Sequence, residues 1–162
     1  MRSEDFERLY QEHSQALYAF LVYRVGNESL AEDLLADTFE RVLRSHWRFD
    51  RRRSSEKTWL YTIALNLLRD GARRETVAQR AMERVAAGVR EEDSSSWADE
   101  LQHRDQISRA LPILTIEERE AISLRYGGDL TVPEIAKVLD EKVSTVEGRV
   151  YRALRKLRVE LE

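Results

Sequence analysis

The sequence predicts an all-α protein built from two small helical domains joined by a flexible linker. Apolar residues recur at helical spacing through most of the 162-residue chain, a pattern typical of helices that bury one face. Only 6 Gly and 2 Pro interrupt it, too few for a turn-rich β protein. A stretch rich in Ala, Arg, Glu and Ser separates the two periodic parts, which is a typical linker composition. We therefore expect domains at residues 1–75 and 105–162, with a linker at 76–104.

The first domain is expected to hold three helices. The first covers about residues 3–25, with Ser3 as its N-cap. The second begins at a capping box, residues 29–32, in which Ser and Glu side chains would bond to free backbone N–H groups. Helical periodicity is lost over residues 46–55, which predicts a basic loop with aromatic side chains. The third helix covers residues 55–71 or continues past them.

The second domain is expected to be a compact four-helix unit. Pro112 would end its first helix. Further capping boxes at residues 115–118, 131–134 and 144–147 predict the starts of the other three. The Gly127-Gly128 pair separates the first two of these three helices.

Residues 131–139 (TVPEIAKVL) and 144–157 (STVEGRVYRALRKL) carry the most information about function. Two short helices meet there at a tight turn, and the second has apolar residues on one side and Arg and Lys on the other. This arrangement is typical of a helix-turn-helix, whose second helix enters the DNA major groove. Arg149 or Arg152 could then pair bidentately with guanine. The alternative is a basic helix face that is merely solvated.

A second group of residues, 47–53 (WRFDRRR) followed by Trp59, mixes aromatic rings with cations. Such a mixture suits unpaired bases, because rings stack on bases at about 1–3 kcal/mol each and Arg binds phosphate. The alternative is that Phe49 and Trp59 belong to the core. No phosphate-binding Gly-rich loop or catalytic triad is recognisable, so we expect neither enzymatic activity nor a cofactor.

Composition limits where the protein acts and what it needs. Cysteine is absent and the three His are scattered, which excludes disulfides and makes a metal site unexpected. No apolar run reaches the ~20 residues of a membrane-spanning helix, and no signal peptide is recognisable, so we expect a cytoplasmic protein without membrane insertion. The formal net charge is −3, which predicts weak DNA affinity for the chain alone and a partner that supplies further binding.

Taken together, these segments resemble the extracytoplasmic-function (ECF) branch of the bacterial sigma-70 family, over nearly the whole chain. Residues 31–39 (AEDLLADTF) are similar to the region-two helix that docks on the clamp helices of the RNA polymerase β′ subunit. The resemblance implies a polymerase-binding set of five residues: Asp33, Leu34, Asp37, Thr38 and Phe39.

Residues 58–66 (TWLYTIALN) resemble the segment that melts and recognises the minus-ten promoter element. In the family a loop before this helix holds a flipped-out base, and here that loop would be residues 46–57. The implied minus-ten contacts are Trp47, Phe49, Arg52, Trp59, Asn66, Arg69, Arg73 and Arg74.

Residues 124–126, 134–136 and 145–149 resemble region four, whose recognition helix binds the minus-thirty-five element. One departure is Asp140, where the family usually has Gly in the turn. Asp tolerates the left-handed conformation better than most residues, so the turn should be kept. The expected minus-thirty-five contacts are Ser144, Thr145, Glu147, Arg149, Arg152, Arg155 and Lys156.

The resemblance implies a sigma factor that binds the β and β′ subunits of core RNA polymerase and promoter DNA. It also implies an anti-sigma factor, which could hold the protein at the membrane. Two other classes remain: a free-standing helix-turn-helix regulator, which would need an α/β first half, and a helical adaptor that binds only proteins. Footprinting with and without core polymerase would distinguish all three.

Overall fold

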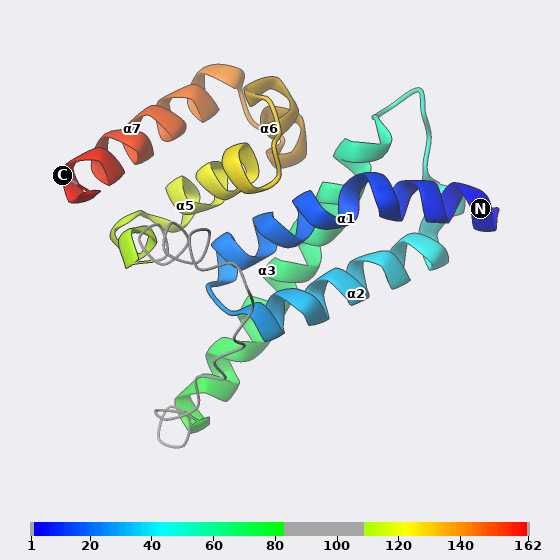
Figure 1. The fold of residues 1–162 in the computed structure, drawn as a ribbon, viewed down its shortest axis with the longest axis horizontal. Helices are drawn as coiled ribbons and strands as arrows, with labels where there is room; N and C mark the ends of the chain where they lie inside the picture. The colour runs from blue at the N-terminus through cyan, green and yellow to red at the C-terminus, as the bar shows by residue number, and fades with distance from the viewer. Residues whose placement is uncertain (1, 83–108, 162) are drawn as a thin grey trace, which may run out of the picture.

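Helices make up the structure, a computed structural model that describes residues 2–82 and 109–161 (Figure 1). The described part of the chain contains no strand, as the sequence predicts. Most of the predicted linker, residues 83–104, lies outside the described residues, and side chains are described for residues 2–71 and 109–161. None of the described helices is long and apolar enough to cross a membrane.

The N-terminal module is a bundle of three long helices, in which the first two are joined by a tight turn. Gly26 makes this turn in the left-handed conformation, with φ of 71°. Leu17, Phe20, Val42 and Leu60 are fully buried between the helices. The elements are α1 (Ser3–Val25), α2 (Glu28–Ser45), the short η1 (His46–Arg48) and α3 (Glu56–Met82).

The C-terminal module contains the predicted helix-turn-helix. Its turn between α6 and α7 is made at Asp140, with φ of 54°, so the prediction that Asp accepts the left-handed conformation is confirmed. Pro112 lies in a short 3-10 turn. The elements are η2 (Leu111–Ile113), α5 (Ile116–Ile122), its π-helical continuation η3 (Ser123–Gly127), α6 (Val132–Leu139) and α7 (Val143–Leu161).

The helix starts agree with the sequence at some positions and differ at others. Complete capping boxes begin α5 at Thr115 and α6 at Thr131, as predicted. The predicted box at residues 29–32 is wrong: α2 begins at Glu28, because the Asn27 side chain already accepts the Leu30 N–H. Two further predicted N-caps are wrong, since each of these helices starts earlier than expected. Ser3 is the first residue of α1, and the box at 144–147 lies inside α7.

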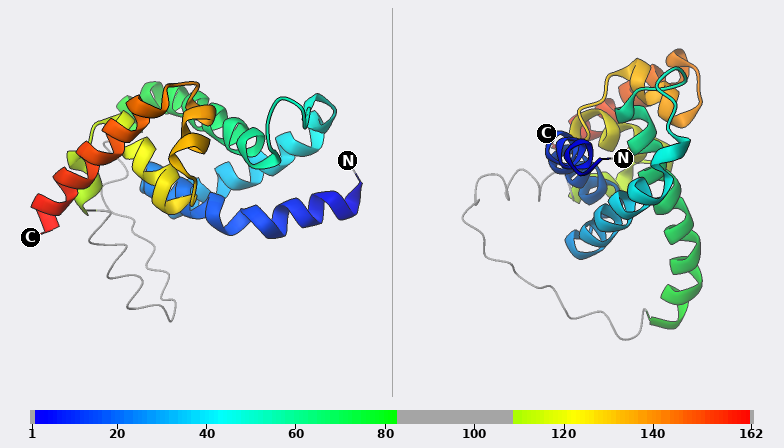
Figure 2. Two further views of the ribbon diagram at one scale, coloured as in Figure 1. Left: turned by 90° about the horizontal axis from the view of Figure 1, so that it is seen from above. Right: turned by 90° about the vertical axis from the view of Figure 1, so that its right-hand side faces the viewer.

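The two modules pack against each other and share one hydrophobic core. Figures 1 and 2 show α5 and α6 beside α1 and the start of α3, while α2 lies on the other side of α1. Tyr61 on α3 is fully buried, and its hydroxyl donates a hydrogen bond to the Gly128 carbonyl across the boundary, at 3.2 Å. Burial raises the pKa of the Tyr61 hydroxyl, so it remains a donor at neutral pH.

Candidate nucleic-acid interface

Helix α7 is held against its module by one apolar face. Val146, Val150, Ala153 and Leu157 are buried, at the i, i+4, i+7, i+11 spacing of a single helix face. Packing of this face fixes which side of α7 points outward. The remaining side, which carries the cations, is therefore open to solvent and could enter a DNA groove.

All but one of the expected minus-thirty-five residues are exposed on α7, and Arg149 is the exception. Arg152 is exposed, and its guanidinium lies over Gly148. A larger residue at position 148 would leave this guanidinium less room. The Arg149 side chain is only 18% exposed and forms an ion pair with Glu141 in the turn. Arg149 therefore connects the turn to α7. The exposed members of the set are Ser144, Thr145, Glu147, Arg152, Arg155 and Lys156.

Lys156 is attached to α5 by a buried carboxylate. Its Nζ donates to Glu118 Oε1 at 2.6 Å, and the Glu118 side chain is only 5% exposed. Burial raises the pKa of Glu118, but hydrogen bonds from Lys156 and Thr115 outweigh it and leave the pKa below its ordinary value. Glu118 is thus ionised at neutral pH and fixes the orientation of α7 relative to α5.

Tyr151 is a candidate contact that the sequence reasoning missed. It is 67% exposed and lies three residues beyond Gly148 and one before Arg152, within the same turns of α7. A large exposed aromatic ring among polar side chains is able to contact base methyl groups. The signal was present in the spacing, because Tyr151 does not share the buried face.

The basic loop exposes one aromatic ring and partly buries two others. Trp47 is 70% exposed, its Nε1–H is bonded to the Arg44 carbonyl, and the Arg48 guanidinium lies 4.8 Å from its ring. Phe49 and Trp59 are half-buried and in contact, with ring centroids 5.1 Å apart. Arg52 is exposed in the same loop. Rings and cations therefore lie together in this part of the structure, with Trp59 partly buried.

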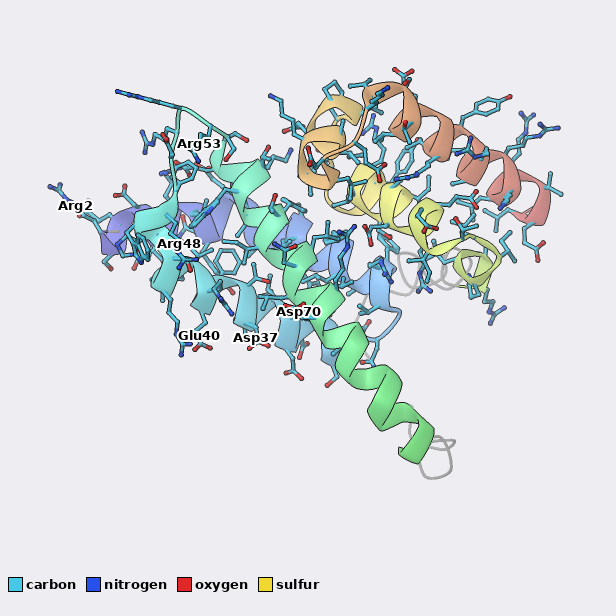
Figure 3. The ribbon with its side chains drawn as sticks, turned by 180° about the vertical axis from the view of Figure 1, so that it is seen from behind. Arg2, Asp37, Glu40, Arg48, Arg53 and Asp70 are labelled. Carbon is cyan, nitrogen blue, oxygen red and sulfur yellow. The ribbon has the colours of Figure 1, made fainter. Side chains whose placement is uncertain are left out.

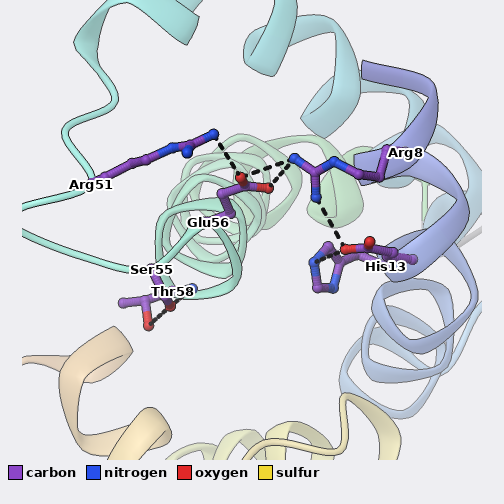
Figure 4. Close-up of polar contacts among 7 residues, drawn as sticks. Arg8, His13, Arg51, Ser55, Glu56 and Thr58 are labelled. Carbon is purple, nitrogen blue, oxygen red and sulfur yellow. Dashed lines mark hydrogen bonds and ion pairs between the residues drawn. The ribbon is translucent and has the colours of Figure 1, made fainter. Parts of the chain in front are cut away.

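A pocket of about 130 Å³ opens between this loop, α1 and the start of α3. Phe49 and Trp59 line one part of it, and Arg8 and Glu56 line another. Arg8 Nη2 contacts both Glu56 oxygens, at 3.0 and 3.1 Å, and Arg51 also reaches Glu56 (Figure 4). Sequence reasoning missed Arg8, because it lies far from the loop in the chain and only folding brings it close.

Helix α3 carries the other expected minus-ten residues. Asn66 and Arg69 are exposed, although Arg69 Nη2 contacts Glu120 Oε1 of the C-terminal module at 2.7 Å. Arg73 and Arg74 follow on the same helix, beyond the residues whose side chains the structure describes. Asn66 and Arg69 lie one turn apart, so their side chains share a face of α3.

The expected polymerase-binding residues on α2 divide into exposed acids and buried neighbours. Asp33 and Asp37 are exposed, and Figure 3 shows Asp37 pointing outward from the helix. Leu34, Thr38 and Phe39 are buried, and the Thr38 hydroxyl donates to the Leu34 carbonyl. Of this set, a protein partner could touch the two acids directly, while the buried residues hold the helix in place.

Comparison with known proteins agrees with this arrangement. Models of Sigma-70 region 2 and of Sigma-70, region 4 match residues 9–93 and 104–157. ECF RNA polymerase sigma factor SigX of Bacillus subtilis is 38% identical over 94% of this chain and 83% of SigX. ECF RNA polymerase sigma factor RpoE of Cereibacter sphaeroides is 30% identical over 94% of this chain and 84% of RpoE.

A solved structure has a similar fold over nearly its whole length. It is the sigma factor RpoE from Bartonella quintana in complex with the anti-sigma factor NepR, with a TM-score of 0.75 and 25% identity over 98% of this chain and 97% of that one. The chain described here therefore belongs to the sigma-70 family, as an ECF RNA polymerase sigma factor with region 2 in its N-terminal module and region 4 in its C-terminal module.

Proposed function

We propose that this sigma factor directs core RNA polymerase to promoters by placing α7 in the minus-thirty-five major groove. The observation that carries the proposal is the outward face of α7, where Arg152, Arg155 and Lys156 are exposed opposite a buried apolar face. Side chains near the start of a recognition helix reach base edges, and later cations meet phosphates.

At the minus-ten element, the N-terminal module would capture an unpaired base. The exposed ring of Trp47 and the pocket beside Phe49 and Trp59 support this role, because stacking at about 1–3 kcal/mol per base is comparable to the cost of extruding a nucleotide. Arg52, Arg69, Arg73 and Arg74 would bind the backbone. Strand opening would then use binding energy, without nucleotide hydrolysis by this chain.

Core polymerase would be bound through the α2 surface that presents Asp33 and Asp37, which suits a basic partner such as the β′ clamp helices. Region 4 would contact the β subunit. Functional boundaries at residues 1–75, 76–104 and 105–162 are part of this proposal. The net charge of −3 fits a factor whose DNA affinity is completed by the enzyme that carries it.

Run-off transcription with core polymerase and a promoter library tests the proposal, combined with footprinting. We expect protection of two promoter elements only when core polymerase is present. Protection by the chain alone would instead indicate a free-standing regulator, and protection in neither case would indicate a protein-binding adaptor. Either result would exclude the mechanism proposed here.

Regulation by an anti-sigma factor in the cytoplasm is a further part of the proposal. It is supported by the solved relative, which was crystallised with the anti-sigma factor NepR. An anti-sigma factor anchored in the membrane would hold this chain at the membrane until a signal releases it. Cell fractionation before and after induction would detect this, as a shift from the membrane fraction to the soluble fraction.

A further inference from the structure

We propose that Glu120 of the C-terminal module occupies the place of a DNA phosphate on the N-terminal module, so that the free chain blocks part of its own minus-ten surface. The proposal rests on the assignment of Arg69 to minus-ten DNA made above. It goes beyond that assignment because it makes module packing and DNA binding mutually exclusive.

The Glu120 carboxylate is placed between two arginines of the other module. Its Oε1 lies 2.7 Å from Arg69 Nη2, and its Oε2 lies 3.3 Å from Arg24 Nε. The Glu120 side chain is only 6% exposed, while Arg69 is 50% exposed. An anion that bridges two guanidinium groups at these distances makes the contacts that a backbone phosphate would make.

The ion pairs at the module boundary have a consistent direction. Lys57 of the N-terminal module donates to the Asp129 carbonyl at 3.2 Å and lies 3.5 Å from Glu134 Oε1. In the described part of the chain, each ion pair between modules thus joins a cation of the N-terminal module to a carboxylate of the C-terminal module. DNA would compete for these same cations.

The two promoter elements cannot be reached with the modules in contact. Their names place them about 25 base pairs apart, which is roughly 85 Å of B-DNA at 3.4 Å per base pair. The longest described helix, α3 with 27 residues, is only about 40 Å long. Separation of the modules is therefore required, and it frees Arg69 for DNA at the moment when Glu120 becomes hydrated.

Glu120→Gln tests the inference, with Glu117→Gln as the matched control. Both variants remove one negative charge from α5, but Glu117 is exposed and has no ion pair with the other module among the described contacts. Two measurements on the full chain without polymerase are needed: the radius of gyration by small-angle scattering, and the affinity for a fluorescent single-stranded oligonucleotide of mixed sequence. Circular dichroism checks that both variants are folded.

We expect Glu120→Gln to increase the radius of gyration and to tighten oligonucleotide binding by about fivefold or more, with Glu117→Gln close to wild type in both. An unchanged radius would overturn the role of Glu120 in holding the modules together. A larger radius without tighter binding would overturn its role as a phosphate substitute. Neither result depends on promoter recognition, so failure of the proposed function would be seen separately, in the transcription assay.

Discussion

At the scale of single residues, burial decides what each arginine of α7 can do. Arg149 and Arg152 are three positions apart in a basic helix, and sequence alone made both candidates for guanine recognition. In the fold, Arg149 is largely buried and paired with Glu141, whereas Arg152 is exposed over Gly148. The first residue stabilises the turn, and the second is available to DNA.

Separate alanine substitutions should therefore give different defects. Arg152→Ala should weaken binding to the minus-thirty-five element by about 1–3 kcal/mol and relax the preference at one base pair. Arg149→Ala should mainly lower stability, because Glu141 loses its partner. Holoenzyme binding to promoters with single base changes, together with thermal unfolding of the free variants, measures both effects. Equal loss of base preference in the two variants would contradict the assignment.

The proposed docking surface on α2 presents two exposed acids, Asp33 and Asp37. Asp37→Arg should weaken binding to core polymerase at least tenfold through like-charge contact with a basic partner, and leave the fold intact because Asp37 is exposed. Glu7→Arg, an equal charge change at an exposed position of α1, serves as control. Competition with a labelled sigma factor for core polymerase measures the loss. Normal binding by Asp37→Arg would mean that the docking surface is misplaced.

At the scale of elements, the turn before α7 depends on one backbone conformation. Asp140 has φ of 54°, in the left-handed region that costs roughly 1 kcal/mol for a residue with a side chain and less for Gly or Asp. Asp140→Gly should therefore keep or slightly raise the free energy of unfolding, and Asp140→Val should lower it by more than about 1 kcal/mol. Urea unfolding of the two variants distinguishes them. Equal stability would mean that the turn relaxes.

The contact between α5 and α7 makes stability depend on acid. Burial raises the pKa of Glu118, but the bonds from Lys156 and Thr115 prevail and its pKa in the fold lies below the ordinary 4.5. A carboxylate whose pKa is lowered by folding stabilises the fold at pH values above its pKa in the unfolded chain. This stabilisation is lost as the pH falls through its pKa in the folded chain. Wild type should thus be more stable than Glu118→Gln at pH 7, and this gap should shrink below about pH 4. Urea unfolding across this range measures it.

Helix identity and the buried faces could be predicted because local spacing determines them. Caps were less predictable, since Asn27 and Ser29 are both good N-caps, and in the structure the Asn27 side chain is the one that accepts the Leu30 N–H. The site divides similarly: the exposed face of α7 follows from helical spacing. The Arg149–Glu141 and Arg8–Glu56 pairs depend on tertiary contacts that no local pattern encodes.

At the scale of the whole molecule, the shared core makes the two modules behave as one unit. Tyr61, Phe20, Leu124 and Leu130 are fully buried in a single cluster that crosses the boundary. Residues in one core unfold together when their contacts depend on one another. We therefore infer that separation of the modules exposes apolar surface and that the shared core opposes this separation in the free chain.

Gly127 provides a test that changes no charge. A Cβ there would lie 2.9 Å from the backbone N and Cα of Phe20, and backbone atoms cannot move aside as a flexible side chain can. Gly127→Ala should therefore force α1 and η3 apart, lower the free energy of unfolding by about 1–3 kcal/mol and increase the radius of gyration.

Gly71→Ala is the matched control, because nothing lies within 4 Å of a Cβ at this position. An alanine in a helix raises the free energy of unfolding by about 0.5–1 kcal/mol relative to glycine. Tryptophan fluorescence and circular dichroism in urea, with small-angle scattering, measure both. A compact, equally stable Gly127→Ala variant would show that the boundary adapts to the added Cβ, and would contradict this prediction.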